Sequence, residues 1–139
     1  MINDKYRFFE INYKKYILDN GLEVVLRENH DNPTVAVAIL YHVGSSREKL
    51  GKTGFAHLFE HLLFQRSEHV ERNAFFYKIS DLGGDFNGGT WEDGTVYYES
   101  VPNDALEKVL WMESDRMGFF INTVSEKGLE CEKDVVINE

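Results

Sequence analysis

The chain has 139 residues, enough for one modest domain with a real hydrophobic core. Hydrophobic residues make up 42% of the chain and charged residues 28%, as in ordinary globular proteins. The net charge of -9 argues against nucleic-acid binding, because proteins that bind nucleic acids usually carry a basic surface patch. The chain has a single cysteine, Cys131, which excludes an internal disulfide.

The beginning of the chain, residues 1–7, has no apolar stretch of the kind that a signal peptide needs. The longest apolar stretch, residues 35–40, is too short to span a membrane. We therefore expect no signal peptide and no membrane span, and a bacterial cytoplasmic or periplasmic location. Residues 1–139 should form a single domain, with an N-terminal arm over residues 1–15.

Strand and helix patterns alternate along the rest of the chain. An Asn-Gly pair at residues 20–21 is a strong two-residue hairpin signal. In chain order we expect a hairpin with strands 16–18 and 22–27, a buried strand over 34–43, helices over 53–66 and 72–82, an extended glycine-rich segment over 85–90, a strand over 95–101, and helices over 105–117 and from Ser125 onward. This order predicts an α+β fold with helices packed on one face of a mostly antiparallel sheet.

The segment His57-Leu58-Phe59-Glu60-His61 carries the clearest chemical signal. On a helix, the two imidazoles lie one turn apart on one face, and Glu60 lies on the same face. This is the H-x-x-E-H pattern, which offers two zinc ligands and a general base. The alternative is a helix whose histidines are only solvated or hydrogen-bonded.

The opposite face of this helix is apolar and is expected to pack against the rest of the domain. A helical wheel of about 100° per residue groups the following side chains there: Phe55, Leu58, Phe59, Leu62 and Leu63. A helix that packs on one side and presents imidazoles on the other is what a metal site requires.

A catalytic zinc ion usually has three protein ligands, so a third ligand must come from elsewhere in the chain. In the expected last helix, Glu132 and Glu139 are seven positions apart and share a face with Val135 and Val136 nearby, whereas Asp134 points away. We interpret one carboxylate as a ligand and the other as a supporting group. The alternative is a solvated acidic helix end.

Three stretches together resemble the M16 family of zinc proteases, which includes pitrilysin, insulinase and the mitochondrial processing peptidase. They are Gly44-Ser-Ser-Arg-Glu48 with Gly54-Phe-Ala-His-Leu-Phe-Glu-His61, then Gly83-Gly-Asp-Phe-Asn-Gly-Gly-Thr90 with Thr95-Val-Tyr-Tyr98, and finally Glu132-Lys-Asp-Val-Val-Ile-Asn-Glu139. The resemblance covers nearly everything after Leu22.

The resemblance implies a zinc-dependent endopeptidase that hydrolyses peptides or small proteins. It implies that His57, His61 and Glu139 ligate Zn²⁺, that Glu60 is the general base, and that Glu132 is a second helix carboxylate that supports catalysis. The segment formed by Asn87, Gly88, Gly89 and Thr90 would be an edge strand that binds the peptide substrate as an added strand. A partner is also implied: a second M16-like domain or subunit that completes the active site.

The chain departs from the family pattern in two respects. The family often has Asn-Ala where Asn87-Gly88 stands, and a second glycine, Gly89, follows here, so the two glycines would loosen the substrate strand. Family members also continue well beyond the helix that ends here, so we expect an N-terminal fragment of a catalytic domain that alone binds zinc weakly and cleaves little.

Two other functions stay open from the sequence alone. One is a non-catalytic zinc-binding partner subunit of a two-part peptidase. The other is a structural metal module, which normally closes its site with four protein ligands that include cysteine. With Cys131 as the only thiol, the chain offers little for such a site.

Overall fold

The computed structural model describes residues 11–139 and divides the chain into two compact units, Met1–Pro33 and Thr34–Glu139. The described part of the first unit is an antiparallel hairpin with strands β1 (Lys14–Ile17) and β2 (Glu23–Leu26). Gly21 in its turn has a φ of 87°, which explains the Asn-Gly signal and confirms the predicted hairpin. Residues 1–10 of the expected arm over 1–15 lie outside the described residues.

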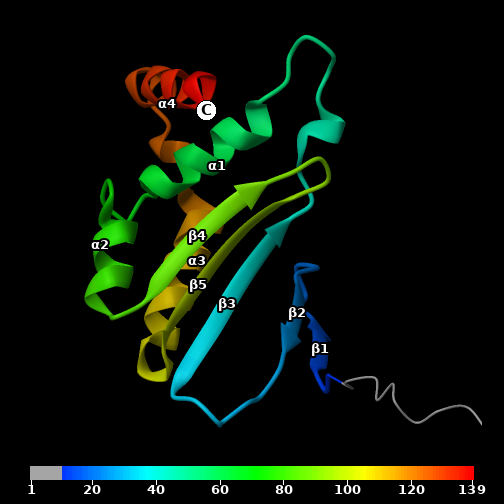
Figure 1. Cartoon of the computed structure of the whole chain (residues 1–139), viewed down its shortest axis with the longest axis vertical. Helices are drawn as coiled ribbons and strands as arrows, with labels where there is room; N and C mark the ends of the chain where they lie inside the picture. Colours follow the sequence, from blue (N-terminus) through cyan, green and yellow to red (C-terminus); the bar gives the residue numbers. More distant parts are fainter. Residues whose placement is uncertain (1–10) are drawn as a thin grey trace, which may run out of the picture. The chain divides into compact units, whose positions relative to one another are not determined.

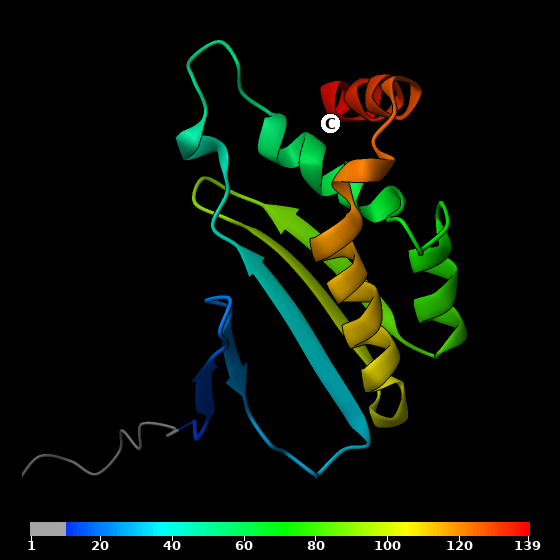
Figure 2. The same cartoon turned by 180° about the vertical axis from the view of Figure 1, so that it is seen from behind.

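The second unit combines a three-stranded antiparallel sheet with four α-helices, and α3 crosses one face of that sheet (Figures 1 and 2). The strand order is β3-β5-β4. The elements are β3 (Thr34–Tyr41), α1 (Phe55–Gln65), α2 (Ala74–Asp81), β4 (Asp85–Thr90), β5 (Thr95–Pro102), α3 (Leu106–Phe119) and α4 (Glu126–Asn138). The predicted elements are confirmed, with boundaries that differ by a few residues. None of the helices in residues 11–139 has the length and apolar character needed to cross a membrane.

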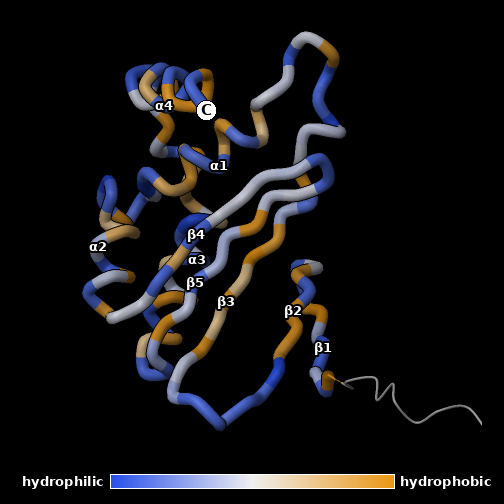
Figure 3. The backbone as a smooth tube through the Cα atoms, viewed as in Figure 1, coloured by the Kyte–Doolittle hydropathy of each residue, from blue (hydrophilic) through white to orange (hydrophobic). Residues whose placement is uncertain are grey.

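Buried and exposed residues alternate along β5, and this pattern shows which face of the sheet the helices cover. Thr95, Tyr97, Glu99 and Val101 are buried, whereas Tyr98 on the other face is exposed. The hydrophobic residues along β3 are visible in Figure 3. One buried face and one open face confirm the α+β class with helices on one side of an antiparallel sheet.

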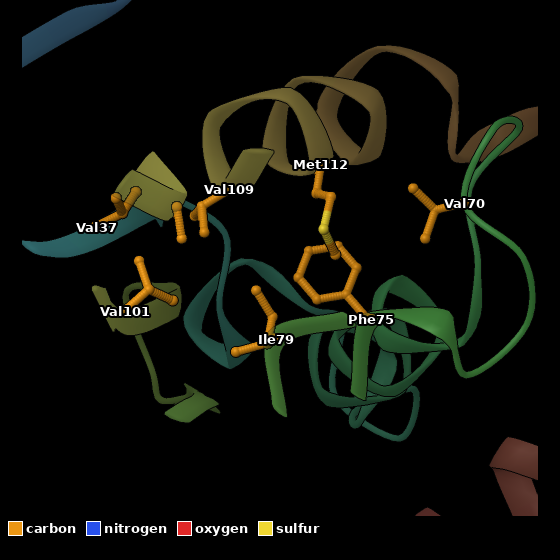
Figure 4. Close-up of a cluster of buried hydrophobic side chains, with 8 residues drawn as sticks. Val37, Val70, Phe75, Ile79, Val101, Val109 and Met112 are labelled. Carbon is orange, nitrogen blue, oxygen red and sulfur yellow. The ribbon is translucent and has the colours of Figure 1, made fainter. Parts of the chain in front are cut away.

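The main core lies between this sheet face, α2 and α3 (Figure 4). Ile79 of α2 and Val109 of α3 are fully buried, and Val101 of β5 is 1% exposed. The other buried members of this cluster are Val37, Val70, Phe75, Ala105 and Met112. This core fixes the sheet and the two helices as the platform on which α1 lies.

A charged cluster is buried in the same layer. Arg116 of α3 is 1% exposed and donates hydrogen bonds to both carboxylate oxygens of Glu113 and to Glu99 of β5, the last at 3.3 Å. Burial, reinforced by the neighbouring Glu113 carboxylate, raises the pKa of Glu99 to about 9. At neutral pH Glu99 therefore keeps its proton beside the Arg116 guanidinium.

The segment that leads to α1 is fastened to the tip of the β4–β5 hairpin. The backbone amides of Ser45 and Ser46 donate to the carbonyl oxygens of Trp91 and Glu92, at 3.3 and 2.8 Å. Gly44 lies so close that a Cβ atom there would be 2.2 Å from the Trp91 oxygen. Its extended backbone suits any residue, so close approach alone explains the glycine.

Glu99 makes the stability of the fold pH-dependent in a defined direction. Between its unfolded pKa of about 4.3 and its folded pKa of about 9, the folded chain keeps a proton that the unfolded chain releases, so stability falls as pH rises. Glu99→Gln should remove this slope. Urea denaturation should find the variant more stable than the unchanged chain near pH 8 and similar to it near pH 5. Parallel pH profiles of the two proteins would contradict the assignment.

Gly44→Ala should lower the free energy of unfolding by about 1–3 kcal/mol, because the backbone must move away from the hairpin tip. Gly118→Ala is the matched control, since Gly118 lies inside α3 with open space around its Cβ position. That change should stabilise the chain by about 0.5–1 kcal/mol. Thermal and urea unfolding check both values, and equal effects of the two substitutions would be inconsistent with the close contact.

Candidate metal centre

The start of α1 is held by an acidic side chain that the sequence analysis did not identify. The carboxylate of Glu48 accepts hydrogen bonds from the backbone amides of Gly54 and Ala56, both at 2.7 Å. These amides belong to the first turn of the helix, where a negative charge is also favoured by the helix dipole. Glu48 thereby fixes the turn that carries His57. The only sequence signal was an acid shortly before a helix.

The apolar face of α1 packs less completely than expected. Leu58 and Leu62 are buried in a second hydrophobic cluster, but Phe55 and Phe59 are 52% and 43% exposed. The two phenylalanines line an open, mainly apolar cavity of about 340 Å³ that also reaches Glu60. The expectation of one continuous packed face was therefore right for the leucines and wrong for these two aromatic side chains.

The last helix, α4, packs against α1 and carries Glu132, and Glu139 directly follows its last residue (Figures 1 and 2). Ser125 caps it by accepting a hydrogen bond from the Gly128 amide at 3.2 Å, as predicted. Leu129 and Val136 pack onto the leucines of α1. Helical spacing places Glu132 and Glu139 on the same face as these two residues, so the apolar contact brings both carboxylates to the histidines. Val135, by contrast, is 41% exposed.

Three predicted ligand atoms form a nearly regular triangle. Nε2 of His57 and Nε2 of His61 are 3.2 Å apart, and Oε2 of Glu139 lies 3.3 and 3.4 Å from them. Tetrahedral zinc with bonds of about 2.0–2.1 Å separates its donors by about 3.3 Å. The donor types and their spacing therefore fit a zinc ion. The side chains of His57 and Glu139 are 38% and 50% exposed, which leaves one side of the triangle open.

The predicted general base, Glu60, lies on the same helix and is 8% exposed. Its Oε2 accepts a hydrogen bond from Oγ1 of Thr90 at 2.5 Å. Thr90 also lies 3.1 Å from the Thr95 hydroxyl, which donates to the Val43 carbonyl at 2.9 Å. Because Thr95 uses its proton on Val43, the Thr90 proton is left for Glu60. The arrangement fixes the orientation of the carboxylate.

Glu132 lies behind the triangle rather than in it. It is 6% exposed, and its Oε2 lies 3.5 Å from Nδ1 of His61, on the far side of that ring from Nε2. Its other oxygen accepts a hydrogen bond from Gln65 at 2.6 Å. Gln65 was missed in the sequence, although it follows His61 by four positions and therefore lies on the ligand face of α1.

The segment predicted to bind substrate forms strand β4, which pairs with β5 along its whole length. Within residues 11–139 its other edge pairs with no strand. Gly88 has a packing role, because a Cβ there would lie 2.8 Å from the ring of Phe64. Thr90 directs its hydroxyl to Glu60, and Asn87 accepts a hydrogen bond from the Gly88 amide.

Residues 23–139 match the model of a protein family described as Insulinase (Peptidase family M16). The zinc protease PqqE of Helicobacter pylori is 32% identical over 128 residues, which are 91% of this chain and 28% of that protein. The mitochondrial-processing peptidase subunit beta of Saccharomyces cerevisiae is 27% identical over 122 residues, which are 88% of this chain and 26% of that protein.

A solved structure, described as the crystal structure of a protease from Helicobacter pylori, superimposes with a TM-score of 0.85 at 30% sequence identity. The alignment covers 91% of this chain and 30% of that one, so the chain spans less than a third of the length of these relatives. The match over residues 23–139, together with the superposition, shows that the chain belongs to the insulinase family of peptidases, family M16.

Proposed function

We propose that this chain carries the zinc site of a metalloendopeptidase that hydrolyses peptides or small proteins. The observation that carries the proposal is the donor triangle of His57, His61 and Glu139, with edges of 3.2, 3.3 and 3.4 Å. A carboxylate of the same helix, Glu60, stands three positions after His57 and one before His61, a spacing that puts it on the ligand face of the helix. Two imidazoles, one acid ligand, an open side and a nearby base are the components of hydrolytic zinc sites.

When bound there, a zinc ion supplies Lewis acidity, which polarises a peptide carbonyl and favours deprotonation of a water molecule. The chain's own residues supply the proton handling and the positioning. Glu60 accepts a proton from the attacking water and returns it to the leaving nitrogen. Thr90 holds one carboxylate oxygen of Glu60, which keeps the other available for this exchange. Glu132 supports His61 from behind.

The substrate is an extended peptide that lies along the free edge of β4. Edge strands present unpaired amide and carbonyl groups, which bind a peptide backbone as an additional strand. Asn87, Gly88, Gly89 and Thr90 form the part of this strand nearest to the β4–β5 turn, and Thr90 links it to Glu60. A second M16-like domain or subunit would cover the open side of the site and hold the peptide there.

Two substitutions separate metal binding from proton transfer. His57→Ala should abolish zinc binding, measured by equilibrium dialysis against zinc, because only two of the three proposed protein ligands remain. Glu60→Gln should keep the zinc and, once the chain is combined with the second M16-like domain or subunit that completes its site, reduce chelator-sensitive cleavage of an unstructured peptide by about 10²–10⁴-fold. His42→Ala is the matched control, since His42 lies outside the triangle in the same chain.

The result expected for the unchanged chain at saturating zinc is about one bound zinc ion, retained in Glu60→Gln and in His42→Ala. If His57→Ala keeps its zinc, the triangle is not the metal site. If Glu60→Gln cleaves as fast as the unchanged chain, the proton acceptor is a different group.

A further inference from the structure

Gln65 lies at the end of α1, one turn beyond His61, and connects the candidate metal centre to a surface arginine. We propose that Gln65 is a positioning residue for the metal ligand His61, because its side-chain amide holds Glu132 in the orientation that selects the ligating tautomer of the imidazole. This inference rests on the proposed zinc site and extends it to a residue that touches neither the ion nor the substrate.

The orientation of the Gln65 amide is fixed by its two neighbours. Nε of Arg72 lies 2.9 Å from Oε1 of Gln65, and Nε2 of Gln65 lies 2.6 Å from Oε1 of Glu132. A guanidinium only donates hydrogen bonds and a carboxylate only accepts them. The amide can satisfy both partners in one orientation alone, with its NH₂ group toward Glu132.

Glu132 is thereby held at one oxygen and free to act at the other. Its Oε2 lies 3.5 Å from Nδ1 of His61, and because the carboxylate is an acceptor, it favours the imidazole with its proton on Nδ1. Nε2 of His61 then carries a lone pair, and this is the atom that faces His57 and Glu139. The Glu132 oxygen beside Nδ1 is buried, whereas Glu139, 3.4 Å from Nε2, is half-exposed and screened by water, so Glu132 has the stronger influence on the position of the proton. A proton on Nδ1 leaves the other ring nitrogen free to act as a ligand.

Without the Gln65 amide, Glu132 would lose this restraint at a site where it is 6% exposed. A buried carboxylate oxygen without a donor is unfavourable, so the Glu132 carboxylate would rotate and its second oxygen would leave its position beside Nδ1 of His61.

Arg72 belongs to a loop that is held by hydrogen bonds near both of its ends. The amide of Asn73 donates to the Gln65 carbonyl at 2.8 Å, in a turn where Asn73 has a φ of 61°. Earlier in the loop, the carboxylate of Asp115 accepts from the Ser67 hydroxyl and the His69 amide. These contacts hold Arg72 beside the Gln65 oxygen, although its own side chain is exposed.

The test uses the metal-free, full 139-residue chain. Long-range ¹H–¹⁵N correlation spectra at mildly alkaline pH report which ring nitrogen of His61 carries the proton in the neutral imidazole. The unchanged chain should show mainly the Nδ1–H form of His61. Gln65→Met removes both amide contacts at similar side-chain length and should shift His61 toward the Nε2–H form. Gln65→Lys, which restores a donor to Glu132, should restore the Nδ1–H form.

Zinc affinity provides the second measurement. Competition with a chromophoric chelator should show that Gln65→Met weakens zinc binding by about 10–100-fold, as expected for loss of an outer-sphere partner, and that Gln65→Lys recovers most of it. Arg66→Gln, a change at the exposed neighbouring residue, should leave both the tautomer and the affinity unchanged. Circular dichroism confirms that each variant is folded. If Gln65→Met does not fold, Arg72→Met replaces it, with a smaller shift in the same direction.

Unchanged His61 tautomers in folded Gln65→Met, or in folded Arg72→Met where that variant replaces it, would overturn the inference. So would full zinc affinity in the same variant. Failure of the proposed function looks different: the unchanged chain would bind no zinc, while the His61 tautomer would still respond to Gln65 and support the positioning role.

Discussion

One buried guanidinium joins the elements that support the candidate metal centre. Arg116 of α3 forms a buried ion pair with Glu113, donates a hydrogen bond to Glu99 of β5, and lies 4.2 Å from the ring centroid of Tyr97 and 5.3 Å from that of Phe64. Phe64 belongs to α1, and the Tyr97 hydroxyl donates to the Glu60 carbonyl. The metal helix therefore lies directly on this cluster. Removal of one partner from such a buried ion pair is costly, because the remaining charges stay out of water.

The candidate metal centre also requires the contact between α1 and α4, because the proposed ligands come from two segments that are far apart in the sequence. Helical periodicity orders each set of groups locally, but only packing brings the sets together. Leu58 and Leu62 of α1 meet Val136 of α4, and Glu139 follows three positions later on the same face. The apolar contact thus determines the distances between the proposed metal ligands, and the carboxylate ligand, Glu139, is the last residue of the 139-residue sequence.

A feature of this molecule was predictable from the sequence when the residues that determine it lie close together along the chain. The hairpin, the sheet strands and the histidines His57 and His61 depend on short spacings that the sequence displays directly. Glu139 was identified by its helical face and by family resemblance, and its distance to the histidines was not predictable, because it depends on tertiary packing. Glu48 acts from an irregular loop whose path no pattern specifies. Gln65 was on the correct helical face, but its partners become visible only in three dimensions.

X-ray absorption at the zinc K-edge of the zinc-loaded chain tests the central claim most directly, because it reports the donors around the ion. The donor triangle predicts a four-coordinate site of nitrogen and oxygen atoms at about 2.0–2.1 Å, with outer scattering from two imidazole rings. A six-coordinate oxygen site without imidazole scattering, or a site with one imidazole, would contradict the account. In that case the spacing of His57, His61 and Glu139 would reflect helix packing alone.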